Sequence, residues 1–251
     1  MKKITVITVT YNSSKYIERL IEAIQNSAKY IHEIVIVDND SPDKTTTNKI
    51  VDRQTKKSKI PIRLFHHQNE GFATSCNYAA KFVTTSHILF LNPDTKPNVN
   101  SIDILFEHHL EAKADISGSK LVNEHAEEGA YISKLPNLYY GIFHLSNIGK
   151  ILRYDSARLK FLYKDADSKS KYVADSDVET VSGACMLISK YSFSKLAGFD
   201  EKIFLYLEDV DLCYRAKKCG MKIVFCPHSI ISHTGGASSS NPHRINQQAW
   251  F

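Results

Sequence analysis

The turn that follows the first predicted strand contains no glycine. Dinucleotide-binding loops of the G-x-G-x-x-G type and phosphate-binding P-loops need glycine there, because only glycine lets the backbone approach a phosphate so closely. Residues 4–9 form a continuous apolar run that is followed by Thr10-Tyr-Asn-Ser-Ser14. This absence argues against a dehydrogenase and against an ATPase of the P-loop kind.

Other features are also scarce. The five cysteines have no C-x-x-C spacing and are odd in number, which is typical of reduced thiols in the cytosol. No apolar run approaches the roughly 18 residues of a membrane-spanning helix, and no signal peptide precedes Ile4. The net charge of +5 does not call for a nucleic acid, although it is compatible with anionic small substrates or an acidic membrane surface. We therefore expect a cytoplasmic protein.

Strand and helix patterns alternate along the first half of the 251 residues. Short β-rich apolar runs occupy residues 4–9, 33–37, 62–66 and 88–91, and helical patterns separate them. This β-α-β alternation predicts an α/β fold with a doubly wound, mostly parallel sheet up to about residue 119.

Acidic residues follow two of these strands directly. Ligands of open parallel sheets bind beyond the carboxyl ends of the strands. Asp38, at the end of the second strand, can therefore hydrogen-bond a base or a ribose, although Asp38-Asn-Asp-Ser-Pro42 also suits a simple turn. Asp94, in Asn92-Pro-Asp94, can hold a divalent ion against a diphosphate, since hard cations prefer oxygen ligands.

The segment 69–77 opens a helix with Asn69-Glu-Gly-Phe-Ala73. Gly71 permits close approach of a ligand, and free N–H groups at a helix start suit a phosphate.

The second half is less regular. Residues 138–163 mix aromatic and basic side chains, which favours a helical insertion over a lipid-facing surface. Strands are expected in 181–189, 222–226 and 229–233, with Gly183 and Ala184 leaving room for a substrate. His233 can ligate a metal or a phosphate, but a histidine at a strand end usually does neither.

The stretch 208–218 has the charge order of a helix, with acids at its start, bases at its end and Gly220 just beyond. At about 100° per residue, Leu212, Cys213 and Ala216 form a buried face with Asp209 at its head. Glu208 is expected to point away from that face, as is Asp211, which is spaced for an i, i+4 ion pair with Arg215. A partly desolvated Asp209 has the raised proton affinity of a general base, although acids are common in first helical turns.

Together these motifs resemble family-2 glycosyltransferases, most closely the rhamnosyltransferase-like members that build bacterial surface polysaccharides. The resemblance extends from Ile4 to Gly235. The motifs that carry it, in order, are Val6-Ile-Thr-Val-Thr-Tyr-Asn12, Ile34-Val-Ile-Val-Asp-Asn-Asp-Ser41, Asn69-x-Gly-Phe-Ala73, Phe90-Leu-Asn-Pro-Asp94, Ser182-Gly-Ala184, Phe199-Asp-Glu201, Glu208-Asp-Val-Asp-Leu212 and His233-x-Gly235.

The resemblance implies a GT-A fold, a nucleotide-diphospho-sugar donor and inversion at the anomeric carbon. It implies one domain over residues 1–251: a nucleotide-sugar-binding half (1–119) and an acceptor-side catalytic half (120–251) with a helical insertion near 138–165. In that scheme Asp38 reads the base, Asp209 is the catalytic base, and Asp94 with His233 holds Mg²⁺ or Mn²⁺. The implied donor-binding residues are Thr10, Asn12, Asp38, Asp40, Asn69, Gly71, Phe72, Asn77, Asn92 and Asp94, and the acceptor-side residues are Gly183, Ala184 and Glu208.

Two positions depart from the family pattern. Asn92 stands where a D-x-D motif has its first aspartate, which removes one charge from the expected metal site. Asp40 stands where many members have glycine or asparagine, so either Asp38 or Asp40 can be the base-reading acid.

The leading hypothesis is transfer of L-rhamnose from dTDP-rhamnose to a hydroxyl of a glycan or lipid-linked saccharide, in O-antigen or cell-wall synthesis. A UDP-sugar-dependent enzyme of the same fold is the alternative, followed by a nucleotidyltransferase and a non-catalytic nucleotide-sugar-binding domain. No nucleic-acid partner is expected, and the protein is expected in the cytoplasm with peripheral association at the inner membrane surface.

Overall fold

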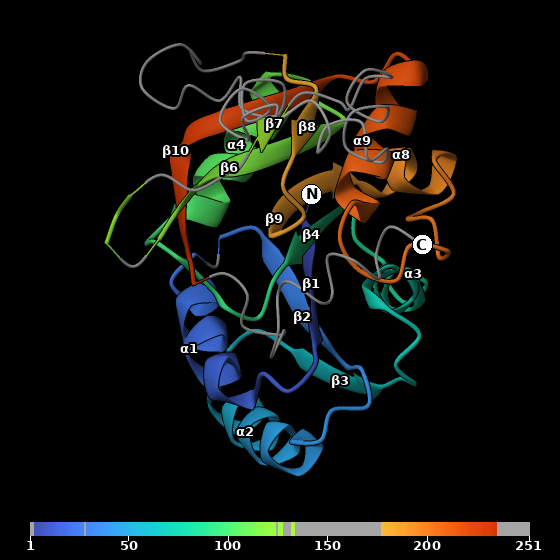
Figure 1. Cartoon of the computed structure of the whole chain (residues 1–251). Coiled ribbons are helices and arrows are strands. Elements are labelled where there is room, and N and C mark those ends of the chain that lie inside the picture. The colour runs from blue at the N-terminus through green and yellow to red at the C-terminus, as the bar shows by residue number, and fades with distance from the viewer. Residues whose placement is uncertain (1–2, 28, 124, 128–131, 134–176, 235–251) are drawn as a thin grey trace, which may run out of the picture.

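The computed structural model describes residues 3–27, 29–123, 125–127, 132–133 and 177–234. In this part of the chain, eight strands form one sheet in the order β3-β2-β1-β4-β9-β6-β10-β5 (Figure 1). Their bounds are β1 (Ile4–Thr10), β2 (Ile31–Asp38), β3 (Ile62–His66), β4 (His87–Leu91), β5 (Thr95–Pro97), β6 (Ile116–Val122), β9 (Cys185–Ser189) and β10 (Ile223–His233). A separate antiparallel pair joins β7 (Ile132–Ser133) to β8 (Thr180–Val181).

The sheet is mostly parallel, as predicted. β1 pairs in parallel with β2 and β4, β2 with β3, and β6 with β10. β9 runs antiparallel to both β4 and β6, and β5 runs antiparallel to β10. All seven residues of β1 are buried, as expected for a strand that is covered on both faces.

The two expected strands at 222–226 and 229–233 form the single strand β10. Its pairing with β6 shifts register between Cys226 and Ile230. Pro227 lies in this interval and has no N–H to give to a neighbouring strand, so an irregularity is expected there.

β9 joins the two halves of the chain. This strand comes from the second half, yet it lies between β4 and β6 of the first half. Both halves of the described chain therefore contribute strands to the eight-stranded sheet, while the division at residue 119 remains a prediction. The expected insertion near 138–165 lies outside the described residues.

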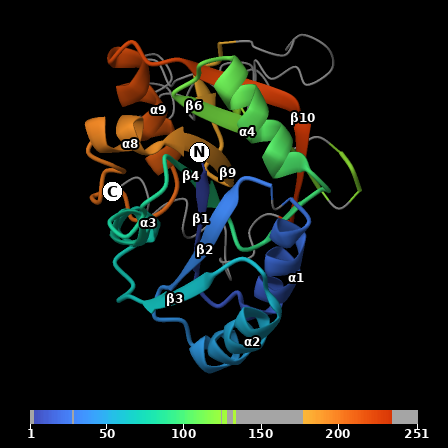
Figure 2. The same ribbon diagram turned by 180° about the vertical axis from the view of Figure 1, so that it is seen from behind.

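The described helices pack on the sheet and on one another. They are α1 (Ser14–Gln25), α2 (Lys44–Lys57), α3 (Phe72–Ala80), α4 (Ser101–Glu111), α8 (Lys190–Lys195) and α9 (Glu208–Lys218). α1 packs on α2, and α3 packs on β1 and β2. Figure 2 shows α4 across β6 and β10, and both views place α8 and α9 beside α3. One contiguous hydrophobic core connects these layers. Among the described helices, none combines the length and apolar character that crossing a membrane requires.

Candidate active site

Three polar residues lie level with one another at the carboxyl ends of adjacent strands. Thr10 of β1 pairs with Asp38 of β2, and Asp38 pairs with His66 of β3. Because these strands are parallel, their last residues meet at one edge of the sheet, where ligands of such sheets bind.

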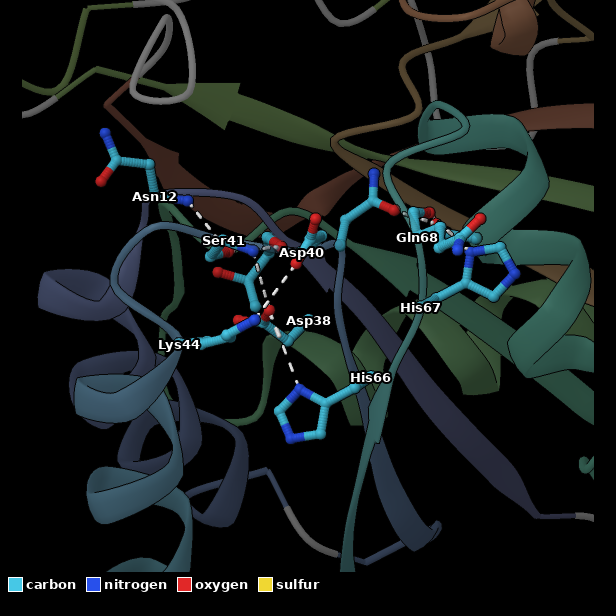
Figure 3. Close-up of polar contacts among 11 residues, drawn as sticks. Asn12, Asp38, Asp40, Ser41, Lys44, His66, His67 and Gln68 are labelled. Carbon is cyan, nitrogen blue, oxygen red and sulfur yellow. Dashed lines mark hydrogen bonds and ion pairs between the residues drawn. The ribbon is translucent and has the colours of Figure 1, made fainter.

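Asp38 is fully buried but only partly satisfied. Its Oδ1 accepts a hydrogen bond from the Ser41 N–H at 2.9 Å and lies 3.9 Å from Nδ1 of His66 (Figure 3). Its Oδ2 is buried and has no hydrogen-bond partner among the described residues, and the same is true of the Thr10 hydroxyl. A buried polar atom without a partner costs about 1–3 kcal/mol. Such atoms at a ligand-binding edge are expected to be satisfied by a ligand.

Asp40 has a different environment. It is exposed, adopts a left-handed backbone (φ 55°) and forms an ion pair with Lys44 at 3.3 Å (Figure 3). The geometry therefore favours Asp38 over Asp40 as the acid that reads a base. Asp40 lies instead on the rim of a cavity of about 530 Å³, which is also lined by Lys44, Thr45, Asn48, His66, His67 and Gln68.

Asn12 follows β1 and is exposed. Its backbone N–H donates to Oγ of Ser41 at 3.1 Å, and its φ of 49° is left-handed. The Ser41 N–H in turn holds Asp38, so Ser41 joins the turns after β1 and β2. Sequence reasoning did not select Ser41.

The loop before α3 is fastened to the end of β2. Oδ1 of Asn69 accepts a hydrogen bond from Nδ2 of Asn39 at 2.9 Å, and Oδ1 of Asn39 accepts one from the Ser75 hydroxyl at 2.7 Å. Asn39 is buried and was not predicted to belong to the site. A short polar residue between Asp38 and Asp40 was the only signal for it.

Gly71 lets this loop contact a distant part of the chain. Its φ is +102°, and a Cβ there would lie 2.6 Å from the Phe204 carbonyl oxygen. The next residue, Phe72, donates its N–H to that oxygen at 2.8 Å. The loop predicted to bind the donor is thus joined to the segment 203–207, which leads into α9.

Asn77 has a structural role in this arrangement. Its Oδ1 accepts from the Phe199 N–H, and its Nδ2 donates to the Phe199 carbonyl and to Glu201. These bonds involve both the oxygen and the nitrogen of the Asn77 side-chain amide. They do not test the prediction that Asn77 binds a donor, but the geometry favours a role in holding the loop before α9.

Asp94 and His233 come together from the ends of β4 and β10. Oδ1 of Asp94 lies 3.3 Å from Nε2 of His233, and the Asp94 carbonyl accepts the Thr234 N–H. Neighbouring ligands of an octahedral Mg²⁺ at about 2.1 Å lie about 3 Å apart, so this pair can hold one ion. The described residues contain no group of three or more acidic, histidine or cysteine side chains suited to a metal. An ion at Asp94 would take oxygen ligands beyond this pair as well, such as water or a substrate.

A chain of backbone contacts runs from this pair to Asp209. The Asn92 N–H donates to the Ala184 carbonyl at 3.0 Å, and the Gly183 N–H donates to Oδ2 of Asp209 at 2.7 Å. A Cβ on Gly183 would lie only 3.2 Å from Cβ of Asp209, so glycine allows this close approach. Residues predicted for the donor side, the acceptor side and catalysis thus meet at one place.

The pKa of the Asp209 carboxyl is shifted in the direction expected of a general base. Burial raises the pKa of its carboxyl, and the N–H groups of Gly183 and Val210 oppose that rise. Oδ1 accepts the Val210 N–H at 2.8 Å, so both oxygens are held in place. As predicted, Leu212, Cys213 and Ala216 are buried and Asp211 pairs with Arg215.

The orientation predicted for Glu208 is wrong. Glu208 is only 7% exposed, and burial together with the Asp209 carboxylate raises its pKa. A helical wheel places residue 208 on a face but does not show which neighbours cover that face. The two residues before α9, Tyr206 and Leu207, both adopt left-handed φ angles.

The described strands, with acids at their carboxyl ends and a carboxylate at the start of a helix beside them, define the GT-A type of glycosyltransferase fold. Residues 5–196 match the family model described as glycosyl transferase family 2. That match covers well over half of the chain, so the protein belongs to this family and is a transferase.

Two curated relatives are named as rhamnosyltransferases. The chain is 23% identical over 240 residues to N-acetylglucosaminyl-diphospho-decaprenol L-rhamnosyltransferase of Mycobacterium tuberculosis, covering 91% of this chain and 75% of the relative. It is 22% identical over 232 residues to rhamnosyltransferase WbbL of Escherichia coli K12, covering 88% and 80%.

Solved structures show the same fold. The mannosyltransferase PcManGT of Pyrobaculum calidifontis, in complex with GDP-Man and Mn²⁺, superposes with a TM-score of 0.65 at 16% identity. That superposition covers 99% of this chain. The chain spans 36% to 60% of the length of five such matched structures.

Proposed function

We propose that the protein transfers L-rhamnose from dTDP-rhamnose, with inversion, to a hydroxyl of a glycan or lipid-linked saccharide. The catalytic part of the proposal is supported by two neighbouring backbone hydrogen bonds. The Gly183 N–H donates to Oδ2 of Asp209, and the carbonyl of the next residue, Ala184, accepts the N–H of Asn92 in the Asn92-Pro-Asp94 turn. A base and an expected diphosphate site are therefore neighbours. The choice of rhamnose is supported by the names of the two curated relatives.

Asp38 is proposed to read the base of the nucleotide. Its unpartnered Oδ2 can accept one hydrogen bond, and both thymine and uracil carry an N–H donor at N3. Because both bases satisfy this atom equally, Asp38 does not choose between dTDP and UDP. A UDP-sugar-dependent enzyme of the same fold is therefore the second candidate.

Asp94 and His233 are proposed to hold Mg²⁺ or Mn²⁺ with the diphosphate, while Asn92 supplies a neutral neighbour. When bound, the ion would neutralise charge on the departing nucleotide diphosphate. Asp94 is buried to 4% exposure, which fixes its carboxylate at the end of β4. The donor diphosphate is proposed to supply further oxygen ligands beside the Asp94–His233 pair.

Asp209 is proposed to accept the proton of the attacking acceptor hydroxyl. The hydroxyl oxygen forms a bond to the anomeric carbon as the bond to the diphosphate oxygen breaks, and the proton passes to Asp209. Gly183 and Ala184 leave space beside this carboxylate because neither side chain extends beyond Cβ. Thr10, Asn12, Asn69, Gly71 and Phe72 are proposed to bound the donor on the other side.

A lipid-linked acceptor in surface polysaccharide synthesis, such as O-antigen or cell wall, completes the proposal. Its support is the M. tuberculosis relative, whose name specifies a diphospho-decaprenol acceptor. The protein would then work in the cytoplasm, in peripheral contact with the inner membrane surface. A nucleotidyltransferase or a non-catalytic binding domain lacks comparable support.

The test is incubation with a panel of dTDP-, UDP- and GDP-sugars, Mg²⁺ or Mn²⁺, and a diphospho-polyprenol saccharide. The expected result is release of dTDP from dTDP-rhamnose and a product heavier by one deoxyhexose by mass spectrometry. Turnover of UDP-sugars alone would replace the rhamnose proposal with the second candidate. Transfer of a nucleotidyl group instead of a sugar would refute both.

A further inference from the structure

Glu208 and Asp209 place two carboxyl groups side by side at the start of α9. Burial raises the pKa of each, and the Asp209 charge raises that of Glu208 further. Glu208 is buried, whereas Asp209 is partly exposed. Two neighbouring carboxylates oppose each other's ionisation, so the residue whose charge has fewer stabilising contacts takes up a proton first.

Asp209 is built to carry a charge. Its two oxygens accept backbone N–H groups from Gly183 at 2.7 Å and from Val210 at 2.8 Å. Hydrogen bonds donated to a carboxylate favour its ionised form. A helix N-terminus also stabilises one negative charge at this position.

Glu208 has less of this compensation, because only its own backbone N–H acts to lower its pKa. It is 7% exposed, and its Oε2 is buried with no hydrogen-bond partner in the described part of the chain. Among the residues that the structure describes, the titratable groups that interact with it are Asp209 on its own helix and Cys76 on α3, and neither supplies a positive charge. Burial and the nearby Glu208 raise the pKa of the Cys76 thiol, so this thiol is uncharged at neutral pH. A neutral carboxylic acid fits this site, whereas a carboxylate does not.

We propose that Glu208 holds the proton of the pair and that Asp209 keeps its single negative charge. Glu208 is then a positioning residue, a buried neutral acid near Cys76 of α3 that keeps the start of α9 in place without competing with Asp209 for protons. The consequence for catalysis rests on the proposed role of Asp209 as the base. The protonation state itself can be tested without any substrate.

Carboxyl ¹³C NMR of protein labelled at glutamate tests it directly. One glutamate resonance is expected to remain in the protonated position at pH 7 and to titrate well above the others. It should disappear in Glu208→Gln, and its midpoint should fall in Asp209→Asn, which removes the neighbouring charge. If every glutamate resonance has already titrated by pH 6, the proposal is wrong. A Glu208 midpoint that Asp209→Asn leaves unchanged would also overturn it.

Thermal unfolding against pH gives an independent test. The folded state retains a proton that unfolded Glu208 releases above its ordinary pKa of about 4.3, so this site costs stability increasingly as the pH rises from there toward the folded pKa. Glu208→Gln removes that cost. At pH 8 its melting temperature is expected to exceed that of the wild-type chain by about 2 °C or more, and the difference should vanish near pH 4.5.

Glu33 supplies a matched control. It is also 7% exposed, but its Oε2 forms an ion pair with Arg63 at 2.8 Å and its Oε1 accepts a hydrogen bond from the Thr5 hydroxyl. Glu33→Gln is expected to lower the melting temperature at pH 8, the opposite of Glu208→Gln. If both variants are destabilised equally at pH 8, Glu208 is ionised in the folded protein and the proposal fails.

The kinetic readout concerns the donor rather than the resting protein. When Glu208 ionises at alkaline pH, a second negative charge appears next to Asp209, and the KM for a diphosphate-containing donor should rise. In Glu208→Gln the donor KM should stay level over the same pH range. If the NMR and unfolding results hold but donor KM is independent of pH in the wild-type chain, the protonation state stands and its link to the proposed function is removed.

Discussion

Replacement of Asp209 by asparagine separates its chemical role from its structural one. Asparagine has the same shape but cannot accept a proton, so turnover is expected to fall by roughly 10²- to 10⁴-fold, the range that general-base catalysis supplies. Donor affinity should stay within a few-fold, because the interaction that is lost belongs mainly to the transition state.

The structure also sets the expected change in stability. The amide offers one acceptor to two backbone donors, Gly183 N–H and Val210 N–H, so one bond is lost at a cost of about 1–3 kcal/mol. Against this, burial no longer penalises a charge at residue 209, since the pKa of Asp209 is raised by burial. These terms oppose each other, and a melting-temperature change within about 4 °C is expected.

Asp211→Asn is the control on the same helix turn. Oδ2 of Asp211 accepts a hydrogen bond from Nε of Arg215 at 2.7 Å in a partly exposed i, i+4 pair, which contributes about 0.5 kcal/mol. Turnover should therefore change by no more than about twofold. The assay is steady-state release of nucleotide diphosphate, with calorimetric titration of the donor. An active Asp209→Asn beside an inactive Asp211→Asn would refute the assignment of the base.

Four further substitutions probe the donor side. Asp38→Asn should weaken nucleotide diphosphate binding about tenfold by calorimetry, since the buried Oδ2 acceptor is lost or replaced; unchanged affinity would remove Asp38 from base recognition. Asp94→Asn should abolish donor binding that EDTA can reverse while leaving the melting temperature nearly unchanged, and His233→Ala should have a smaller effect because histidine is a poor ligand for hard ions. If both retain full, EDTA-sensitive activity, the metal is held elsewhere. Gly71→Ala should lower the melting temperature and raise donor KM, because its Cβ would lie 2.6 Å from the Phe204 carbonyl at a φ of +102°; a variant with wild-type values would show that this contact is not needed.

The strands and the ends of the strands were predictable from sequence. An apolar run such as that of β1 is stable only when both of its faces are buried. The motif residues come directly after such runs in the sequence. Parallel pairing then brings Thr10 and Asp38 to one edge without any further information. The Asp211–Arg215 pair was predictable for the same reason, since helical spacing alone determines it.

What failed depended on contacts between distant segments. Glu208 is buried, and it lies close enough to Cys76 of α3, more than a hundred residues earlier in the chain, to raise the pKa of that thiol. The polar groups of Asn77 are used by Phe199 and Glu201, a contact with a sequence separation of 122 to 124 residues. Helical periodicity identifies one buried face of a helix, but it carries no information on which distant segments of the chain cover its other residues.

The position of β9 has a consequence for how the chain is made. β4 pairs with β1 on one side, and its other edge stays open until Cys185–Ser189 can pair with it. During synthesis the ribosome must therefore add about a hundred more residues after β4 before that edge is covered, and such long-range pairing is slow. An uncovered apolar strand edge is a template for aggregation. Expression of residues 1–119 alone is thus expected to give insoluble protein, and a nascent chain stalled before Cys185 is expected to depend on chaperones.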